Sequence, residues 1–159
     1  MREILFRAKT VPNCKDVITG KIIKNPKWIY GYVDLGYMHD CKDSLISDEK
    51  GNKTYKCQYE TIGQFTGLTD KNGKKIFEGD IVQYSIEEDQ AAFVGAVKFG
   101  EYNPDCGALH NTNVGFYVEL VDQEGKRTYM RKDIGFWVKF RKVEVIGNIH
   151  DNPELLKEV

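Results

Sequence analysis

Apolar and polar residues alternate over several short stretches of this chain, with a loose period of two. This period is typical of β-strands that pack one face against a core and turn the other toward water. It predicts seven strands, at residues 3–8, 27–33, 81–86, 92–99, 116–120, 136–140 and 143–149. In the later strands the alternation places Phe116, Val118 and Val145 inside the core. The sequence therefore predicts a mainly β fold.

Three segments predict the same kind of turn between antiparallel strands. Residues 48–52, 70–74 and 122–126 each begin with Asp and carry a glycine three residues later. Glycine takes a positive φ at little cost, and an Asp side chain can accept hydrogen bonds from the backbone ahead of it. The strand at 92–99 contains Gly95, where we expect a bend or a close backbone approach.

A structural turn is predicted just before the strand at 81–86. There Gly79 is expected to have a positive φ, and Asp80 is expected to accept backbone N–H bonds. Together with Gly73 in the segment 70–74, these residues are interpreted as structural and not as a binding site.

Five short strands at this spacing favour a small SH3-like barrel over about residues 62–149, and not a βαβ sheet. We expect residues 1–60 to form a strand-rich section and residues 61–159 to form the barrel, the two making one structural unit. Asn152 followed by Pro153 predicts the start of a short helix, which must dock on the barrel to be stable.

Composition sets the broad class. The chain has 159 residues, of which 41% are hydrophobic and 12% aromatic, values that a folded domain shows and a disordered one does not. The net charge of −1 excludes a basic protein overall, although a local basic face stays open. No apolar run is long enough for a signal peptide or a membrane span, and the four cysteines are scattered. We expect a cytoplasmic protein with reduced thiols and no membrane partner.

Few groups of residues suggest a catalytic or metal-binding site. His39 and Cys41 with Cys57 and Cys14 form only one close pair, whereas zinc sites commonly need two. Cys106 and His110 share the loop at 100–115, without a visible oxyanion site. The acidic run 87–89 lies on an extended chain, where adjacent carboxylates point to opposite sides. We therefore expect no enzyme activity, no cofactor and no metal.

Basic and aromatic residues gather near the C-terminal end and form a candidate surface for nucleic acid or a partner. They are Tyr129, Arg131, Lys132, Trp137, Lys139, Arg141 and Lys142. Aromatic faces among cations suit a single-stranded nucleic acid. Strand alternation explains the same pattern with the aromatics in the core and the cations in water, so both interpretations stay open.

Four blocks of the sequence together resemble the YopX family of phage and prophage proteins. The blocks are the opening Arg2-Glu3-Ile4-Leu5-Phe6-Arg7-Ala8, the motif Trp28-Ile29-Tyr30-Gly31, residues 61–82 and the ending 145–156. His150 stands where the family more usually has Tyr. The resemblance implies a viral or prophage protein in the cytoplasm of a bacterial host. It carries over no reaction and no catalytic residue.

The functional expectation is a non-enzymatic binding or assembly module. Its partner is an unidentified protein or a second copy of the chain, so that a homo-oligomer is expected. One alternative is nucleic-acid binding through residues 129–142. The other is an enzyme that uses Cys106 and His110.

Overall fold

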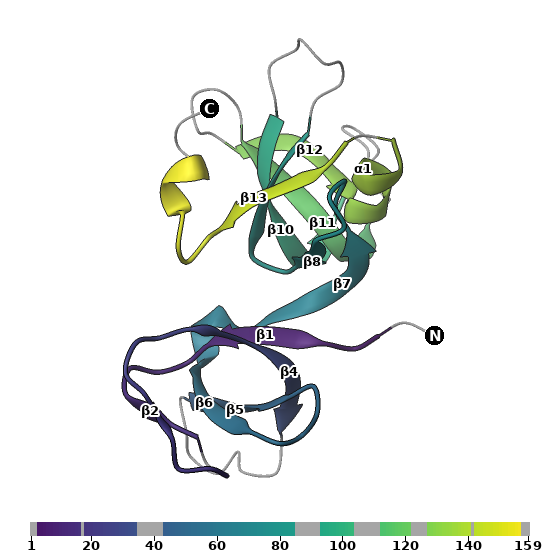
Figure 1. The fold of residues 1–159 in the computed structure, drawn as a ribbon. Coiled ribbons are helices and arrows are strands. Elements are labelled where there is room, and N and C mark those ends of the chain that lie inside the picture. The colour runs from purple at the N-terminus through teal and green to yellow at the C-terminus, as the bar shows by residue number, and fades with distance from the viewer. Residues whose placement is uncertain are drawn as a thin grey trace. The chain divides into compact units, whose positions relative to one another are not determined.

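The computed structural model describes residues 3–16, 18–34, 43–84, 93–103, 112–121, 127–140 and 142–156. The chain divides into two compact units, an N-terminal unit (Met1–Phe65) and a C-terminal unit (Thr66–Val159). Figure 1 shows the strands and helices of both units. Each unit has its own hydrophobic core.

The N-terminal unit is built on one antiparallel sheet and a small two-stranded ribbon. Its elements are β1 (Phe6–Lys9), β2 (Cys14–Lys15), β3 (Ile22–Ile23), β4 (Trp28–Asp34), β5 (Asp43–Asp48), β6 (Thr54–Gln58), the 3₁₀-helix η2 (Tyr59–Thr61) and the start of β7 (Gly63–Thr69). The sheet continues through β7 into β8 (Lys75–Phe77), in the order β6-β5-β4-β1-β7-β8, and β2 pairs with β3. Its core contains Ala8, Ile29 and Ile46, because alternate residues of β1, β4 and β5 point to one side.

The C-terminal unit continues with β7 and is dominated by a five-stranded sheet. Its further elements are β8 (Lys75–Phe77), β9 (Asp80–Tyr84), β10 (Phe93–Tyr102), β11 (Asn113–Val121), β12 (Arg127–Asp133), the helix α1 (Ile134–Phe140), β13 (Glu144–Asn148) and the 3₁₀-helix η3 (Pro153–Leu156). The sheet order is β12-β11-β10-β9-β13, and every pairing is antiparallel. The predicted mainly β class is confirmed.

The three residues predicted to lie in the core of this sheet are buried. Phe116, Val118 and Val145 are buried in one cluster with Tyr84 and Trp137. The described strands form an open sheet with β12 and β13 at its edges, and no closed barrel is seen among them. The narrower expectation of an SH3-like barrel stays a prediction.

Two of the three Asp-Gly turns lie within the described residues. Asp48 accepts the backbone N–H of Asn52 at 2.7 Å, and Gly51 has a φ of +67°. Asp70 accepts the N–H of Asn72 at 2.8 Å, and Gly73 has a φ of +81°. The third, 122–126, lies outside the described residues, although the strands β11 and β12 that flank it do pair.

The turn before β9 forms hydrogen bonds with β8 and β10. Gly79 has a φ of +80°, and its N–H donates to the carbonyl of Val97 at 2.9 Å. The buried Asp80 carboxylate accepts the N–H of Phe77 at 2.7 Å. Gly95 lies where β10 and β11 approach closely, since a Cβ there would come within 2.7 Å of the Glu119 carbonyl oxygen. The expected close approach at Gly95 is confirmed.

The predicted strand at 136–140 is wrong, because these residues belong to the helix α1. Asp133 caps the helix by accepting the N–H of Phe136 at 3.0 Å. Ile134 and Trp137 are buried and Val138 is partly buried, which is a helical spacing of three and four. Packing on the core therefore outweighed the strand preference of an aromatic segment.

The chain ends its described part with a short helix, as expected, but the helix is a 3₁₀ turn and not an α-helix. The N–H of Leu155 donates to the Asn152 carbonyl at 3.1 Å. Leu155 and Leu156 pack against Ile81 and Val94, on the sheet face opposite the main core. Docking on the sheet stabilises a helix that is too short to persist alone.

Candidate binding surface

Of the residues of the surface predicted at 129–142, the structure describes the side chains of Trp137, Lys139 and Lys142. Tyr129, Arg131 and Lys132 lie on the edge strand β12, whose backbone pairs with β11. Trp137 lies on the buried face of α1, and its indole is therefore in the core and not on the surface. Lys139 and Lys142 are exposed, and Arg141 lies outside the described residues. The nucleic-acid hypothesis for this stretch stays a prediction.

The helix α1 presents an exposed aromatic ridge, which we define as Phe136, Lys139 and Phe140. The two phenylalanines are 37% and 54% exposed, and their ring centroids are 5.1 Å apart. The Lys139 ammonium lies 5.2 Å from the centroid of the Phe140 ring, within the range of a cation–π contact. Exposed apolar rings on a helix fixed from below are typical of an interaction surface.

An aromatic network fixes the ridge to the core. The edge of one ring meets the face of the other where Phe136 contacts Trp137, with centroids 5.3 Å apart. The Trp137 ring lies 4.0 Å from Tyr84, which in turn stacks on Phe93 at 5.2 Å. Pairs of this kind each contribute about 1 kcal/mol beyond their burial. The ridge is therefore mounted on rigid neighbours.

The signal for this ridge was present in the sequence. Phe136 and Phe140 are four residues apart, which places them on the same face of a helix. Read as a strand, the same segment directs both rings toward the core side together with Val138. The ridge was missed because the helix was missed.

Two cysteines of the proposed zinc arrangement lie buried in the N-terminal unit as free thiols. The Cys14 sulfur lies 3.4 Å from the carbonyl oxygen of Lys56, and the Cys57 sulfur lies 3.6 Å from that of Tyr55. Among the described residues, no group of three or more His, Cys, Asp and Glu side chains is placed to hold a metal ion. Of the other candidates, His39, Cys41, Cys106, His110 and residues 87–89 all lie outside the described residues.

Burial should make Cys57 unreactive. Desolvation, with a smaller contribution from nearby Cys14, raises the pKa of the Cys57 thiol to about 12. Because the thiolate is the nucleophile, we expect iodoacetamide at neutral pH to leave Cys57 unmodified in the folded protein and to modify it in urea. Peptide mapping by mass spectrometry measures this. Equal modification of Cys57 in the folded and unfolded protein would contradict its burial.

Among the described residues, a charged pair lies across two strands of the five-stranded sheet. Lys98 of β10 forms an ion pair with the buried carboxylate of Glu119 on β11. The pair joins two neighbouring strands of the sheet.

The described residues thus define a mainly β protein of two compact units, with buried thiols in one and an aromatic ridge on the other. None of its described helices combines the length and the apolar character needed to cross a membrane. The chain belongs to the YopX family, because residues 20–157 match the family described as YopX protein. This confirms the resemblance in the sequence.

The comparison with curated proteins finds no match. Among solved structures, the chain is similar to the crystal structure of protein EF1440 from Enterococcus faecalis. The two share 22% identity, the alignment covers 98% of this chain and 99% of that one, and the TM-score is 0.45.

Proposed function

We propose that this protein is a non-enzymatic assembly module that associates with a second copy of itself through the aromatic ridge on α1. The observation that carries the proposal is the exposure of Phe136 and Phe140 on a helix whose opposite face is fixed in the core. Rings that stay exposed in this way gain free energy when another apolar surface covers them.

Charge along the helix favours a second copy as the partner. The exposed Asp133 lies at the beginning of α1, and the exposed Lys139 and Lys142 lie at its end. When two such helices pack antiparallel about a twofold axis, the Asp133 of each faces the Lys139 and Lys142 of the other. The two pairs of phenylalanine rings then meet at the centre, where contacts contribute most.

The expected dimer is weak, since a helix of seven residues is only about 10 Å long. Sedimentation velocity over a range of protein concentrations measures it directly. We expect the wild-type protein to shift from monomer to dimer, and the double variant Phe136→Ala/Phe140→Ala to associate at least about tenfold more weakly, because each ring contributes about 1 kcal/mol or more.

Tyr59 supplies a matched control. It is an exposed aromatic residue on the N-terminal unit, 61% exposed, and Tyr59→Ala should leave association unchanged. A wild-type protein that stays monomeric at the highest concentration, or a double variant that associates as well as wild type, contradicts the proposal.

The cellular setting belongs to the same proposal. The family resemblance implies a viral or prophage protein that acts in the cytoplasm of a bacterial host. The free thiols of Cys14 and Cys57 support a reducing compartment, since the cytoplasm keeps cysteines reduced.

A further inference from the structure

The beginning of this chain carries an excess of positive charge. Residues 1–27 contain seven Lys and Arg against two Asp and Glu, whereas the remaining residues contain 16 against 22. The net charge of −1 therefore conceals a basic segment joined to an acidic remainder. Net charge alone was a poor guide to possible partners of this segment.

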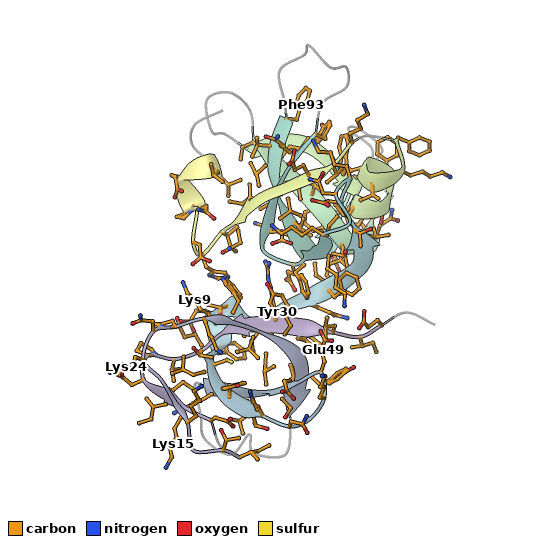
Figure 2. The ribbon with its side chains drawn as sticks, in the orientation of Figure 1. Lys9, Lys15, Lys24, Tyr30, Glu49 and Phe93 are labelled. Carbon is orange, nitrogen blue, oxygen red and sulfur yellow. The ribbon has the colours of Figure 1, made fainter. Side chains whose placement is uncertain are left out.

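Much of the basic segment folds into the ribbon of β2 and β3, which we call the basic ribbon and define as residues 14–27. Within it, Cys14 pairs with Ile23 and Lys15 with Ile22. Cys14 and Ile23 pack on the core of the N-terminal unit, so the other pair faces outward. Figure 2 shows Lys15 and Lys24 projecting away from the ribbon.

The ribbon is held firmly at both ends. At its base, the Thr10 N–H donates to the Lys27 carbonyl at 2.9 Å, and the Lys27 N–H donates to the Thr10 hydroxyl at 3.1 Å. At its tip, the buried Asp16 carboxylate accepts the N–H of Ile18 at 3.0 Å and the Thr19 hydroxyl proton. The Asp16 carboxylate therefore points inward and stabilises the turn.

The lysines of the ribbon are exposed to solvent and can contact an anionic partner. Lys15, Lys21, Lys24 and Lys27 are all exposed, and none of them forms an ion pair with a described residue. The only acidic side chain within the ribbon is Asp16, which is buried in the turn. The Lys27 ammonium lies 5.6 Å from the centroid of the Tyr55 ring, which leaves Lys15, Lys21 and Lys24 as the main positive charges of a local site for a polyanion.

We propose that the basic ribbon binds the phosphate backbone of double-stranded DNA without sequence preference. A two-stranded β-ribbon fits the major groove of a duplex, and lysines neutralise phosphates as point charges. Ile18 and Ile22, 58% and 60% exposed, supply apolar contacts to sugars and base edges in the groove. The ribbon carries no aromatic residue on which unpaired bases could stack, which disfavours a single strand.

An anionic membrane is the other polyanionic surface. The tip of the ribbon has two apolar residues, Val17 and Ile18, followed by Thr19 and Gly20, which is little apolar area for insertion into lipid. The lysines also run along the whole ribbon, down to its base at Lys27. This distribution of lysines along the ribbon suits an extended charged polymer better than a flat membrane surface.

The test is fluorescence anisotropy of a short labelled DNA duplex with the full chain, at several salt concentrations. Wild-type protein should bind at low salt, with an affinity that falls steeply as salt rises. In Lys15→Gln/Lys24→Gln, binding should weaken by about tenfold or more, and the slope of log K against log salt should fall by about 2, because two phosphate contacts are lost.

A matched control removes the same amount of positive charge from another place on the same unit. Lys50→Gln/Lys53→Gln removes two exposed lysines from the β5–β6 turn of the same unit and should bind DNA as wild type does. Absence of wild-type binding at low salt, or equal losses in both double variants, overturns the proposal. Binding to phosphatidylserine vesicles without binding to DNA overturns it in favour of a membrane.

The inference is independent of self-association. The variant Phe136→Ala/Phe140→Ala should keep DNA binding, so the failure of one proposal does not decide the other.

Discussion

Replacing Gly31 by alanine is expected to destabilise the N-terminal unit by about 4 kcal/mol or more, enough to leave much of it unfolded. A Cβ at this position would lie 1.7 Å from the carbonyl oxygen of Ser47 and 2.7 Å from its carbonyl carbon. Both are backbone atoms of β5, so no side-chain rotation relieves the clash. The strands β4 and β5 must separate, and they then lose the hydrogen bonds of a central pair of the sheet.

Hydrogen–deuterium exchange measured by mass spectrometry localises this effect. Peptides that contain β4 and β5 should lose protection in Gly31→Ala, while the total loss of stability is read from urea unfolding. Gly115→Ala is the matched control, because no heavy atom outside the adjacent residues lies within 4 Å of a Cβ there and its φ is not positive. It should change stability by less than about 0.5 kcal/mol. Unchanged protection of β4 and β5 in Gly31→Ala would mean that the strands are not this close.

The parts of the fold that sequence could predict are those with strong local signals. The turns at 48–52 and 70–74 combine an Asp that accepts backbone hydrogen bonds with a glycine of positive φ, and both signals are visible in the sequence. Alternation over 116–120 correctly indicated a strand with Phe116 and Val118 in the core, but the strand is buried on both faces, since Tyr117 and Glu119 are buried as well. Local chemistry decided these elements.

The parts that were missed depend on tertiary contacts. The helix α1 is rich in aromatic and β-branched residues, which favour strands, and only the packing of Ile134 and Trp137 on the core makes it helical. The ribbon of β2 and β3 has two residues in each strand, too few to show any period. Both candidate surfaces lie on these two elements, which explains why the sequence indicated only Lys139 of the residues that form them.

Replacing Asp70 by alanine is expected to destabilise the C-terminal unit by about 3 kcal/mol. One oxygen of this buried carboxylate accepts the N–H groups of Asn72 and Lys74, at 2.8 and 2.9 Å. The other accepts the N–H of Val145 on β13, at 3.0 Å and 75 residues away in the sequence. Asp70 therefore joins the β7–β8 turn to an edge strand, and its loss leaves a buried N–H without an acceptor. Urea unfolding measures the change.

Asp48 is the matched control, since it accepts hydrogen bonds in the corresponding turn between β5 and β6. Its carboxylate bonds only the local N–H groups of Asn52 and Lys53, among the described residues, and both bonds are exposed. Asp48→Ala should therefore cost about 1 kcal/mol. Equal losses for the two Asp→Ala variants would show that the bond to Val145 contributes nothing.

The same carboxylate makes the stability of the C-terminal unit depend on pH. Burial acts to raise the pKa of Asp70, but the hydrogen bonds from Val145, Lys74 and Asn72 outweigh burial and hold the pKa below its usual 3.8. A group whose pKa is lowered by folding stabilises the folded state above its unfolded pKa, and this contribution is lost as the pH falls through the folded pKa.

Wild-type protein should therefore lose stability below about pH 4, and the Asp70→Asn variant should lose less over the same range. Glu144, whose pKa is lowered by its hydrogen bond with Lys71, adds to the loss in both proteins, so only the difference between them reports Asp70. Urea unfolding at a series of pH values tests this. A difference that stays constant from neutral pH down to strongly acidic pH would show that Asp70 is not held ionised by the three N–H groups.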